Sequence, residues 1–562
     1  MEFGRRSWYW PALLVLLAVG MVLRVGNWPH RYETRDVDEA GYLDSSLCLV
    51  EGVTPGYKAA PGGVQIWEGW MYGMAGVVKN IVRPHAEGVG TDMRLRPFVG
   101  MNQALFDNYR DLSGMHGFIL GCNLLMSLGA VYAAYRYGAY RAGLGGGIVA
   151  GGLAAWLPLF VEYASMSRPY SQAWCLGIMA LCAAGTAVRG RAGWTAVLLG
   201  LAIGTRVEML ALVPLVLWEF WERPEREAGW KVVGKLALWT AGMMVVTAPW
   251  LLTNLPGNLR AIATIQFSTP VGGATPWRTT VRDFAIGQGL ALVAVAFLAG
   301  MLPMGNRMQT LRARVGLVIA LGLIVTVVKS TGFGLHHKGY VMVALIPAGV
   351  LAMRALSERS KQVALAIAVV VVLCPLVQAE REISERRSRY DVGNAGLDWI
   401  VANVPAGTRL YVERALKNPL PTAESARVLW GEVTDDAAWR KKFESGLTRF
   451  GMDAADLPGA MSEENLVQER GNMRRWFICG TRASYPERRF DVRIVHGSPV
   501  FGVQDVVEAF AKEGGVVLWR AASNGKPPAG LGKAFKEWVN AEGIGDYVYV
   551  SPAVEQEMKK GL

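Results

Sequence analysis

An acidic run close behind an N-terminal apolar segment is the first part of the sequence that could do chemistry. Residues 35–42 are Arg-Asp-Val-Asp-Glu-Ala-Gly-Tyr. Carboxylates beside a membrane surface are costly unless they are solvated or used. Asp38 or Glu39 could take a proton from an incoming hydroxyl or amine as a general base, and Tyr42 follows at helical spacing. Alternatively, this acidic run is the solvent-exposed start of a loop and has no chemical role.

Two cationic motifs lie further along the chain, each at the start of an apolar run. Residues 167–170 are Ser-Arg-Pro-Tyr, and residues 336–340 are His-His-Lys-Gly-Tyr. Proline suits the first turn of a helix, so a helix is expected to begin at Pro169. Lysine, histidine and tyrosine together could bind a phosphate, although Arg168 and Lys338 could equally be membrane anchors. Adjacent histidines do not share a helix face, so His336 and His337 predict no metal site.

The elements that must position these motifs are long apolar runs. A spanning helix needs about 20 mostly apolar residues. The sequence predicts about eleven such helices, with residues 207–222 and 192–205 the shortest of them. The predicted spans are 8–26, 113–135, 143–163, 169–188, 192–205, 207–222, 233–253, 283–303, 314–332, 339–356 and 361–379.

Basic residues are concentrated in alternate connections between these spans. The connections hold Arg136 and Arg141; Arg189 and Arg191; Arg223, Arg226, Lys231 and Lys235; Arg307, Arg312 and Arg314; and Arg354, Arg359 and Lys361. Cytoplasmic loops carry such an excess of Lys and Arg. The pattern therefore predicts a cytoplasmic N-terminus and places all three chemical motifs on the outer face. The long outer loop 27–112 contains an aromatic, apolar stretch typical of interfacial helices.

The two parts of the chain differ in composition. Residues 1–379 carry the apolar runs and form the predicted transmembrane domain, whereas 380–562 has ordinary soluble composition. Residues 380–392 are charged and predict a linker. Helix-like and strand-like pieces alternate beyond it, which predicts an extracytoplasmic α/β domain.

The charge balance excludes one class of partner. The formal net charge is +12 and the composition is 52% hydrophobic, but many basic residues stand between apolar runs, where they orient helices. Nucleic acid is therefore not a predicted partner, and membrane lipid is. The residues indicate no definite cofactor, and a divalent cation stays open.

At these motifs the chain resembles the GT-C superfamily of membrane glycosyltransferases. It is most similar to dolichyl-phosphate-mannose protein mannosyltransferases and bacterial aminoarabinose transferases. Asp38-Glu39-Ala40-Gly41-Tyr42 is similar to the Asp-Glu-x-x-Tyr of the first outer loop, and Arg168-Pro169-Tyr170 to an Arg-Pro-Tyr motif. Lys338-Gly339-Tyr340 resembles a basic residue and tyrosine before a late helix, although the family usually has arginine directly before the tyrosine.

The resemblance implies an inverting sugar transfer at the outer face, from a polyprenyl-phosphate-sugar to a lipid, glycan or protein acceptor. Asp38 would be the catalytic carboxylate and Glu39 its neighbour. The donor phosphate would be bound by Arg168, Lys338, His336, His337 and Tyr340, with Tyr42 and Tyr170 lining the site.

Two further readings compete with the enzyme. A transporter or lipid flippase would place ionisable residues along a path through the membrane, but the apolar runs hold few charges and show no paired halves. A membrane scaffold would need no outer Asp-Glu pair. The sequence contains no Asn-x-Ser/Thr acceptor in 380–562, which favours a bacterial inner membrane with the C-terminal domain in the periplasm.

Overall fold

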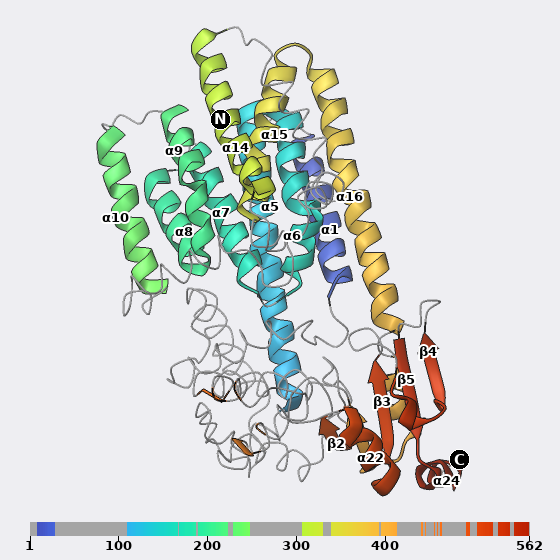
Figure 1. The fold of residues 1–562 in the computed structure, drawn as a ribbon. Coiled ribbons are helices and arrows are strands. Elements are labelled where there is room, and N and C mark those ends of the chain that lie inside the picture. Colours follow the sequence, from blue (N-terminus) through green and yellow to red (C-terminus); the bar gives the residue numbers. More distant parts are fainter. Residues whose placement is uncertain are drawn as a thin grey trace, which may run out of the picture. The chain divides into compact units, whose positions relative to one another are not determined.

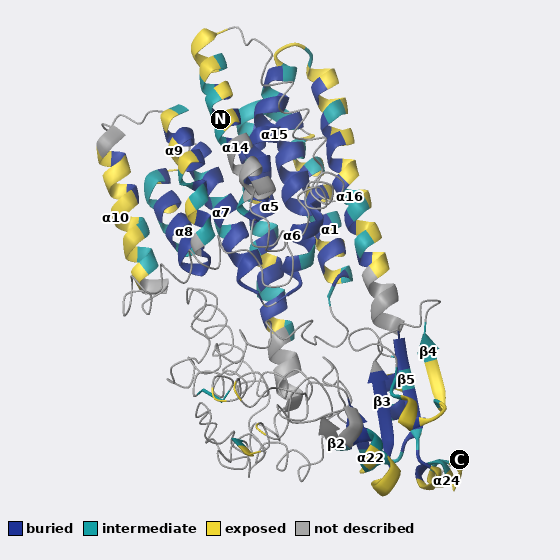
Figure 2. Ribbon diagram, in the orientation of Figure 1, coloured by how far each residue is buried: buried dark blue, intermediate teal, exposed yellow. Residues whose placement is uncertain are grey.

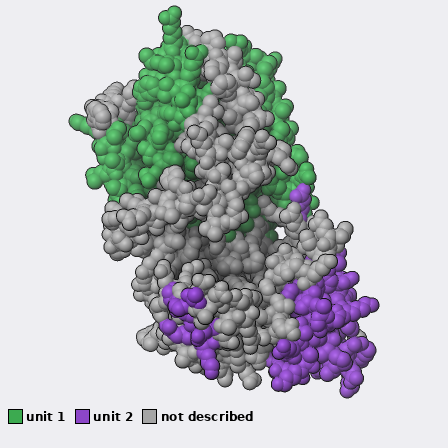
Figure 3. All heavy atoms as spheres, in the orientation of Figure 1, with its two compact units in different colours: residues 1–28, 57–68, 119–384 green, residues 29–56, 69–118, 385–562 purple. Residues whose placement is uncertain are grey.

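The chain is described here by a computed structural model. The described residues are 8–28, 109–166, 168–186, 189–222, 229–247, 306–329, 339–392, 395–412, 490–494, 503–520, 527–539 and 545–560, with single positions between 440 and 462. The predicted span 283–303 lies outside them. The described chain divides into two compact units (Figure 3), which are treated separately below. The first holds residues 8–28 and 119–384, and the second holds 109–118 and the residues from 385 onward.

The first unit is helical (Figure 1). It contains α1 (Tyr9–Gly26), most of α5 (Tyr109–Trp156), α6 (Pro158–Ala164), α7 (Pro169–Gly185), α8 (Arg191–Thr205), the 3-10 helix η3 (Val207–Leu212), α9 (Val213–Glu222), α10 (Gly229–Thr247), α14 (Arg307–Lys329), α15 (Gly339–Ser357) and most of α16 (Lys361–Val392). Each predicted span within the described residues therefore corresponds to helix. Among the described residues, three helices are long and apolar enough to cross a membrane: Tyr9–Gly26, Gly117–Trp156 and Lys361–Glu385.

The burial of side chains shows which helices of this unit are internal and which face its surroundings. α6, α7 and α15 are buried along most of their length (Figure 2). By contrast, α1 and α16 expose apolar side chains, including Leu14 at 62%, Val22 at 64% and Val377 at 64%. Water would disfavour such faces, whereas lipid tails accept them. The chain is therefore an integral membrane protein.

Two helix breaks shape the first unit. Inside α5 the backbone leaves helical geometry at Ala142 and at Gly143, whose φ is +70°. A second break precedes Pro158, which begins α6 and has no N–H to continue the ladder. The predicted span 143–163 is therefore two helical pieces, interrupted at Leu157, and not one uninterrupted helix.

The predicted linker 380–392 is helical instead. α16 does not end with its apolar run but continues to Val392. Glutamate and arginine are good helix formers, and Gln378 Nε2 donates to Glu382 Oε1 over 3.1 Å, one turn along the helix. The change from apolar to charged composition therefore marks a change of environment and no break in the backbone.

The second unit contains a five-stranded mixed sheet with the strand order β2-β1-β3-β5-β4. The strands are β1 (Arg409–Val412), β2 (Asp491–Ile494), β3 (Val516–Arg520), β4 (Lys536–Val539) and β5 (Gly545–Val550), and the helices are α17 (Ala395–Asn403), α22 (Val503–Glu513) and α24 (Pro552–Lys560), with the short 3-10 helix η6 (Ala529–Leu531). β1 pairs in parallel with β2 and β3, whereas β5 runs antiparallel to β3 and β4.

Each face of this sheet has a helix packed near it. Val506 of α22 joins Tyr411, Trp519 and Tyr549 in one apolar cluster. α17 is tied to β5, because the backbone N–H of Gly396 donates to Asp546 Oδ2 over 3.1 Å. A parallel β1–β3 pair with a helix in the crossover is typical of α/β units.

Candidate functional site

Arg168 lies at the N-terminus of α7, where its backbone is extended at φ −128° and ψ 149°. A residue before proline is pushed to this region, and Pro169 then begins the helix as the sequence predicted. The Arg168 side chain is buried, with 8% exposed. A helix N-terminus presents unpaired backbone N–H groups and a partial positive charge. This end of α7 is therefore suited to an anion.

An aromatic cluster adjoins Arg168. The guanidinium lies 5.9 Å from the ring centroid of Tyr163, which meets Tyr170 edge-on at 5.3 Å. Trp174, one turn further along α7, lies 5.3 Å from Tyr163 and 5.9 Å from Tyr170. Aromatic rings in contact restrict one another's orientation, so the rings hold the start of α7 against the end of α6.

A second arginine joins this cluster, and the sequence analysis had not selected it. Arg206 lies between α8 and η3, its guanidinium is 4.6 Å from the centroid of Tyr170, and it forms an ion pair with Glu208. Its exposed fraction is 9%. The sequence did carry a signal for it, because Arg206 and Glu208 are the only charged residues in the stretch 192–218, and ionisable residues inside a membrane are commonly functional.

Gly339 connects the late cationic motif to the same cluster. It begins α15, and a Cβ placed on it would overlap the indole ring of Trp174. The backbone of α15 therefore lies directly on this ring. The structure thus joins two motifs that are far apart in sequence, Arg168-Pro169-Tyr170 and Gly339-Tyr340. Tyr340 is half-buried and packs against the main apolar core.

The remaining predicted site residues lie outside the described part of the chain. These are Asp38, Glu39, Tyr42, His336, His337 and Lys338. Their roles remain predictions.

We expect Gly339→Ala to lower both stability and donor affinity. The added methyl group must displace Trp174 or α15, and such overpacking typically costs about 1–3 kcal/mol. Melting temperature and apparent donor affinity would both be measured. Gly129→Ala is the matched control, since nothing lies within 4 Å of a Cβ at this helical position. Unchanged values for both measurements in Gly339→Ala would show that the close packing has no importance.

Amide and hydroxyl side chains near the cluster tie the interior of α5 to the start of α7 and the end of α6, and the end of α6 to the end of α1. Asn123 of α5 donates to the carbonyl of Met166 over 3.3 Å and accepts from Gln172 Nε2 of α7 over 3.2 Å. Asn27, after α1, donates to Ser165 Oγ over 2.8 Å. Buried amides stay in place only when such bonds satisfy them. The cluster therefore lies on a fixed frame.

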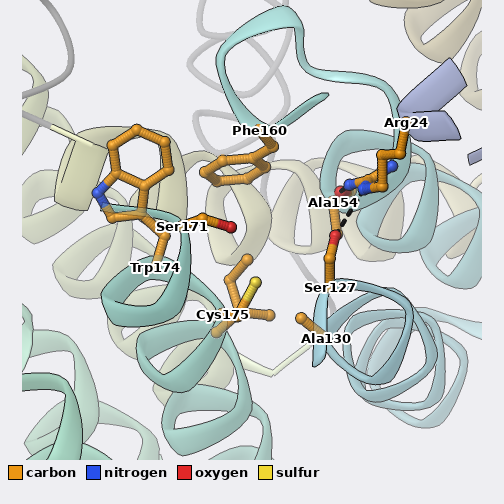
Figure 4. A pocket seen from close by; sticks show the side chains of 9 residues that line it. Arg24, Ser127, Ala130, Ala154, Phe160, Ser171, Trp174 and Cys175 are labelled. Carbon is orange, nitrogen blue, oxygen red and sulfur yellow. Dashed lines mark hydrogen bonds between the residues drawn. The ribbon is translucent and has the colours of Figure 1, made fainter. Parts of the chain in front are cut away.

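Arg24 supports this frame from within the helical unit (Figure 4). It is 1% exposed and donates to the carbonyls of Ala154 and Ala155 over 2.9 and 2.6 Å and to Ser127 Oγ over 2.5 Å. In an unbroken helix the carbonyl of Ala154 would accept from residue 158, but Pro158 has no N–H. Arg24 thus satisfies the acceptor that the helix break exposes. Trp174 and Ser171 line the same small cavity, whose volume is about 10 Å³.

Loss of Arg24 should destabilise the protein. Arg24→Met leaves two buried carbonyls without donors, and each unsatisfied group costs about 1–3 kcal/mol. We expect a lower melting temperature in detergent, with Arg24→Lys intermediate because three ammonium donors replace five guanidinium donors. A methionine variant as stable as the wild type would mean that the break between α5 and α6 needs no capping.

The described part of the site supplies cations and aromatic rings. Arg168 and Arg206 can contact an anion, and the rings exclude water, which strengthens charge interactions. Glu208 offsets the charge of Arg206. The described residues include no group of three His, Cys, Asp or Glu side chains suited to a metal ion. The fold and the site together define a polytopic membrane protein. A buried cluster of arginine and aromatic side chains lies at one end of its helical unit.

Comparison with known proteins identifies no family by sequence. No family model matches the chain, and no curated protein matches it. Among solved structures the chain is similar to ArnT from Cupriavidus metallidurans in the apo state, with 14% identity and a TM-score of 0.43 over 95% of this chain and 97% of that chain.

A second group of similar structures comes from Archaeoglobus fulgidus. Its oligosaccharyltransferase in complex with Zn and sulfate matches at 14% identity and a TM-score of 0.42, over 75% of this chain and 56% of that chain. The oligosaccharyltransferase AglB with an inhibitory peptide and a dolichol-phosphate matches at 10% identity and a TM-score of 0.40, over 76% and 60%.

Proposed function

We propose that this protein transfers a sugar from a polyprenyl-phosphate-sugar to an acceptor at the outer membrane face. The proposal rests on one observation above all. The described parts of two motifs far apart in sequence, Arg168-Pro169-Tyr170 and Gly339-Tyr340, meet at a single aromatic cluster that includes Trp174. Arg206 joins Arg168 at this cluster, from its position between α8 and η3. A lipid-linked phosphate at a membrane face needs such a site, because its charge must be balanced beside apolar surroundings.

The chemistry assigns a role to each group. The acceptor oxygen or nitrogen attacks the anomeric carbon from the side opposite the phosphate, which inverts the configuration. The bond from that carbon to the phosphate oxygen breaks, and the electron pair leaves with the polyprenyl phosphate. Arg168 and Lys338 stabilise the growing negative charge on the leaving phosphate. Asp38 accepts the proton of the acceptor, with Glu39 beside it.

The surrounding site residues complete this assignment. His336, His337 and Tyr340 would contribute hydrogen bonds to the donor, whereas Tyr42 and Tyr170 would line the cavity for the sugar. Arg206 is added to the predicted set, because it stacks on Tyr170. A divalent cation stays open as part of this proposal.

The domain organisation belongs to the same proposal. Residues 1–379 would form the transferase domain with about eleven spanning helices, and 380–562 an extracytoplasmic domain. The concentration of Lys and Arg in alternate connections supports a cytoplasmic N-terminus. A bacterial inner membrane, with the C-terminal domain in the periplasm, is the proposed location.

Lipid extraction from the purified protein tests the function. We expect mass spectrometry to find a polyprenyl-phosphate-sugar among the co-purifying lipids. After reconstitution, this lipid should be converted to free polyprenyl phosphate when an acceptor is supplied. Movement of the intact lipid between leaflets without cleavage of its sugar bond would identify a flippase instead.

A further inference from the structure

The helical unit contains a second charged region, at the end opposite the aromatic cluster. Asn123 lies beside that cluster on α5, and Arg141 lies 18 residues later on the same helix. At 1.5 Å per residue this separation is about 27 Å, close to the hydrocarbon thickness of about 30 Å. The two regions therefore lie near opposite faces of the membrane.

Buried ion pairs organise this second region. Glu219 and Glu222 are at most 6% exposed, and Arg141 contacts both of them. Arg354 Nη1 lies 2.8 Å from Glu222 Oε1, and Arg312 donates to the backbone carbonyl of Glu222 over 3.2 Å. Three of the predicted basic connections thus meet here, as expected for one and the same face.

A cavity of about 650 Å³ opens beside these ion pairs. It lies among the start of α1, the break in α5 and the turn from α15 to α16. Arg141, Arg354 and Lys361 line it with positive charge. Glu358 adds one negative charge, and its Oε1 lies 3.9 Å from Arg354 Nε. Glu222 holds both arginines from behind, so their guanidinium groups are fixed before any ligand arrives.

The walls of this cavity are also aromatic and apolar. Trp8, Tyr9 and Leu365 line it together with the cations, and Trp8 is 74% exposed. Tryptophan and tyrosine favour the headgroup level of a bilayer. Gly143, in its left-handed conformation, forms part of the wall where α5 breaks.

We propose that this cavity binds the headgroup of an anionic phospholipid. The volume falls within the range of about 300–1,000 Å³ that small-ligand sites occupy. Basic pockets between transmembrane helices on the cytoplasmic side bind anionic headgroups. The phosphate lies against Arg354 and Lys361, and Trp8 and Leu365 contact the glycerol and the first acyl carbons. This site is separate from the proposed donor site and independent of the proposed reaction.

Short-chain lipids added to the detergent-solubilised full chain test the site. Dioctanoyl phosphatidylglycerol should raise the melting temperature and change tryptophan fluorescence at concentrations where dioctanoyl phosphatidylcholine does neither. Lys361→Gln should weaken the affinity for dioctanoyl phosphatidylglycerol about fivefold, because one cation near an anionic lipid contributes about that factor. Glu358→Gln should strengthen it, because the one lining carboxylate is removed. Both side chains are exposed, so neither change should prevent folding.

Arg359→Gln is the matched control, as an exposed cation two residues from Lys361 that does not line the cavity. We expect its affinity to stay within about twofold of the wild type. Three results would overturn the proposal: equal binding of phosphatidylcholine, equal stabilisation by inorganic phosphate at the same concentration, or an equal loss in Arg359→Gln. None of these measurements depends on sugar transfer, so the proposed function could fail while this site stands.

Discussion

Replacement of Asp38 by asparagine is expected to lower sugar transfer by about a hundred- to ten-thousandfold, the usual contribution of a general base. Asparagine keeps the size of the side chain but cannot accept the acceptor's proton. Donor binding should remain close to that of the wild type, because the groups proposed to hold the phosphate are unchanged. Turnover would be measured with saturating donor, and donor affinity separately.

The neighbouring carboxylate provides the comparison. Glu39→Gln removes the other candidate base from the same acidic run, and we expect a smaller loss of turnover. If Asp38→Asn keeps more than about a tenth of the wild-type rate while Glu39→Gln does not, Glu39 is the base. If both variants keep it, the acidic run is a solvated loop start and the proposed mechanism fails.

Arg168→Ala should weaken donor binding by about ten- to a hundredfold, the effect of losing one charge-assisted contact. Lys338→Ala should have a smaller effect, because a guanidinium can hold two phosphate oxygens and an ammonium is a point charge. The two losses should be less than additive if both groups contact one phosphate. Apparent donor affinities of the single and double variants decide this.

Arg136→Ala is a close structural control for Arg168→Ala. The Arg136 guanidinium lies 5.7 Å from the ring of Tyr132, so it has the same kind of aromatic partner away from the cluster. Donor affinity in this variant should stay within about twofold of the wild type.

Arg206→Ala should weaken donor binding as well, because the Arg206 guanidinium packs on the ring of Tyr170, which belongs to the cluster. Unchanged affinities in all the cluster variants would assign these arginines to packing and membrane anchoring.

Much of the helical order follows from the sequence alone. Apolar runs predicted α7, α8 and α15 to within a few residues, because a spanning segment needs only local hydrophobicity. Pro169 marked the start of α7 for an equally local reason. The second unit is less readable from the sequence. The charged segment 380–392 predicts a linker, whereas the structure continues α16 to Val392, because a charged helix carries no strong hydrophobic period.

The candidate site shows which features could be predicted from the sequence and which could not. The sequence by itself selected Arg168 and the Lys338-Gly339-Tyr340 motif, since cations next to apolar runs stand out by type and position. Only the tertiary structure decided that Gly339 lies on Trp174 and that Arg206 joins the same rings. It also decided that Arg24 satisfies the carbonyls freed at Pro158. These contacts join residues on different helices, and the hydrophobic period of each helix says which face is apolar but not which neighbour that face meets.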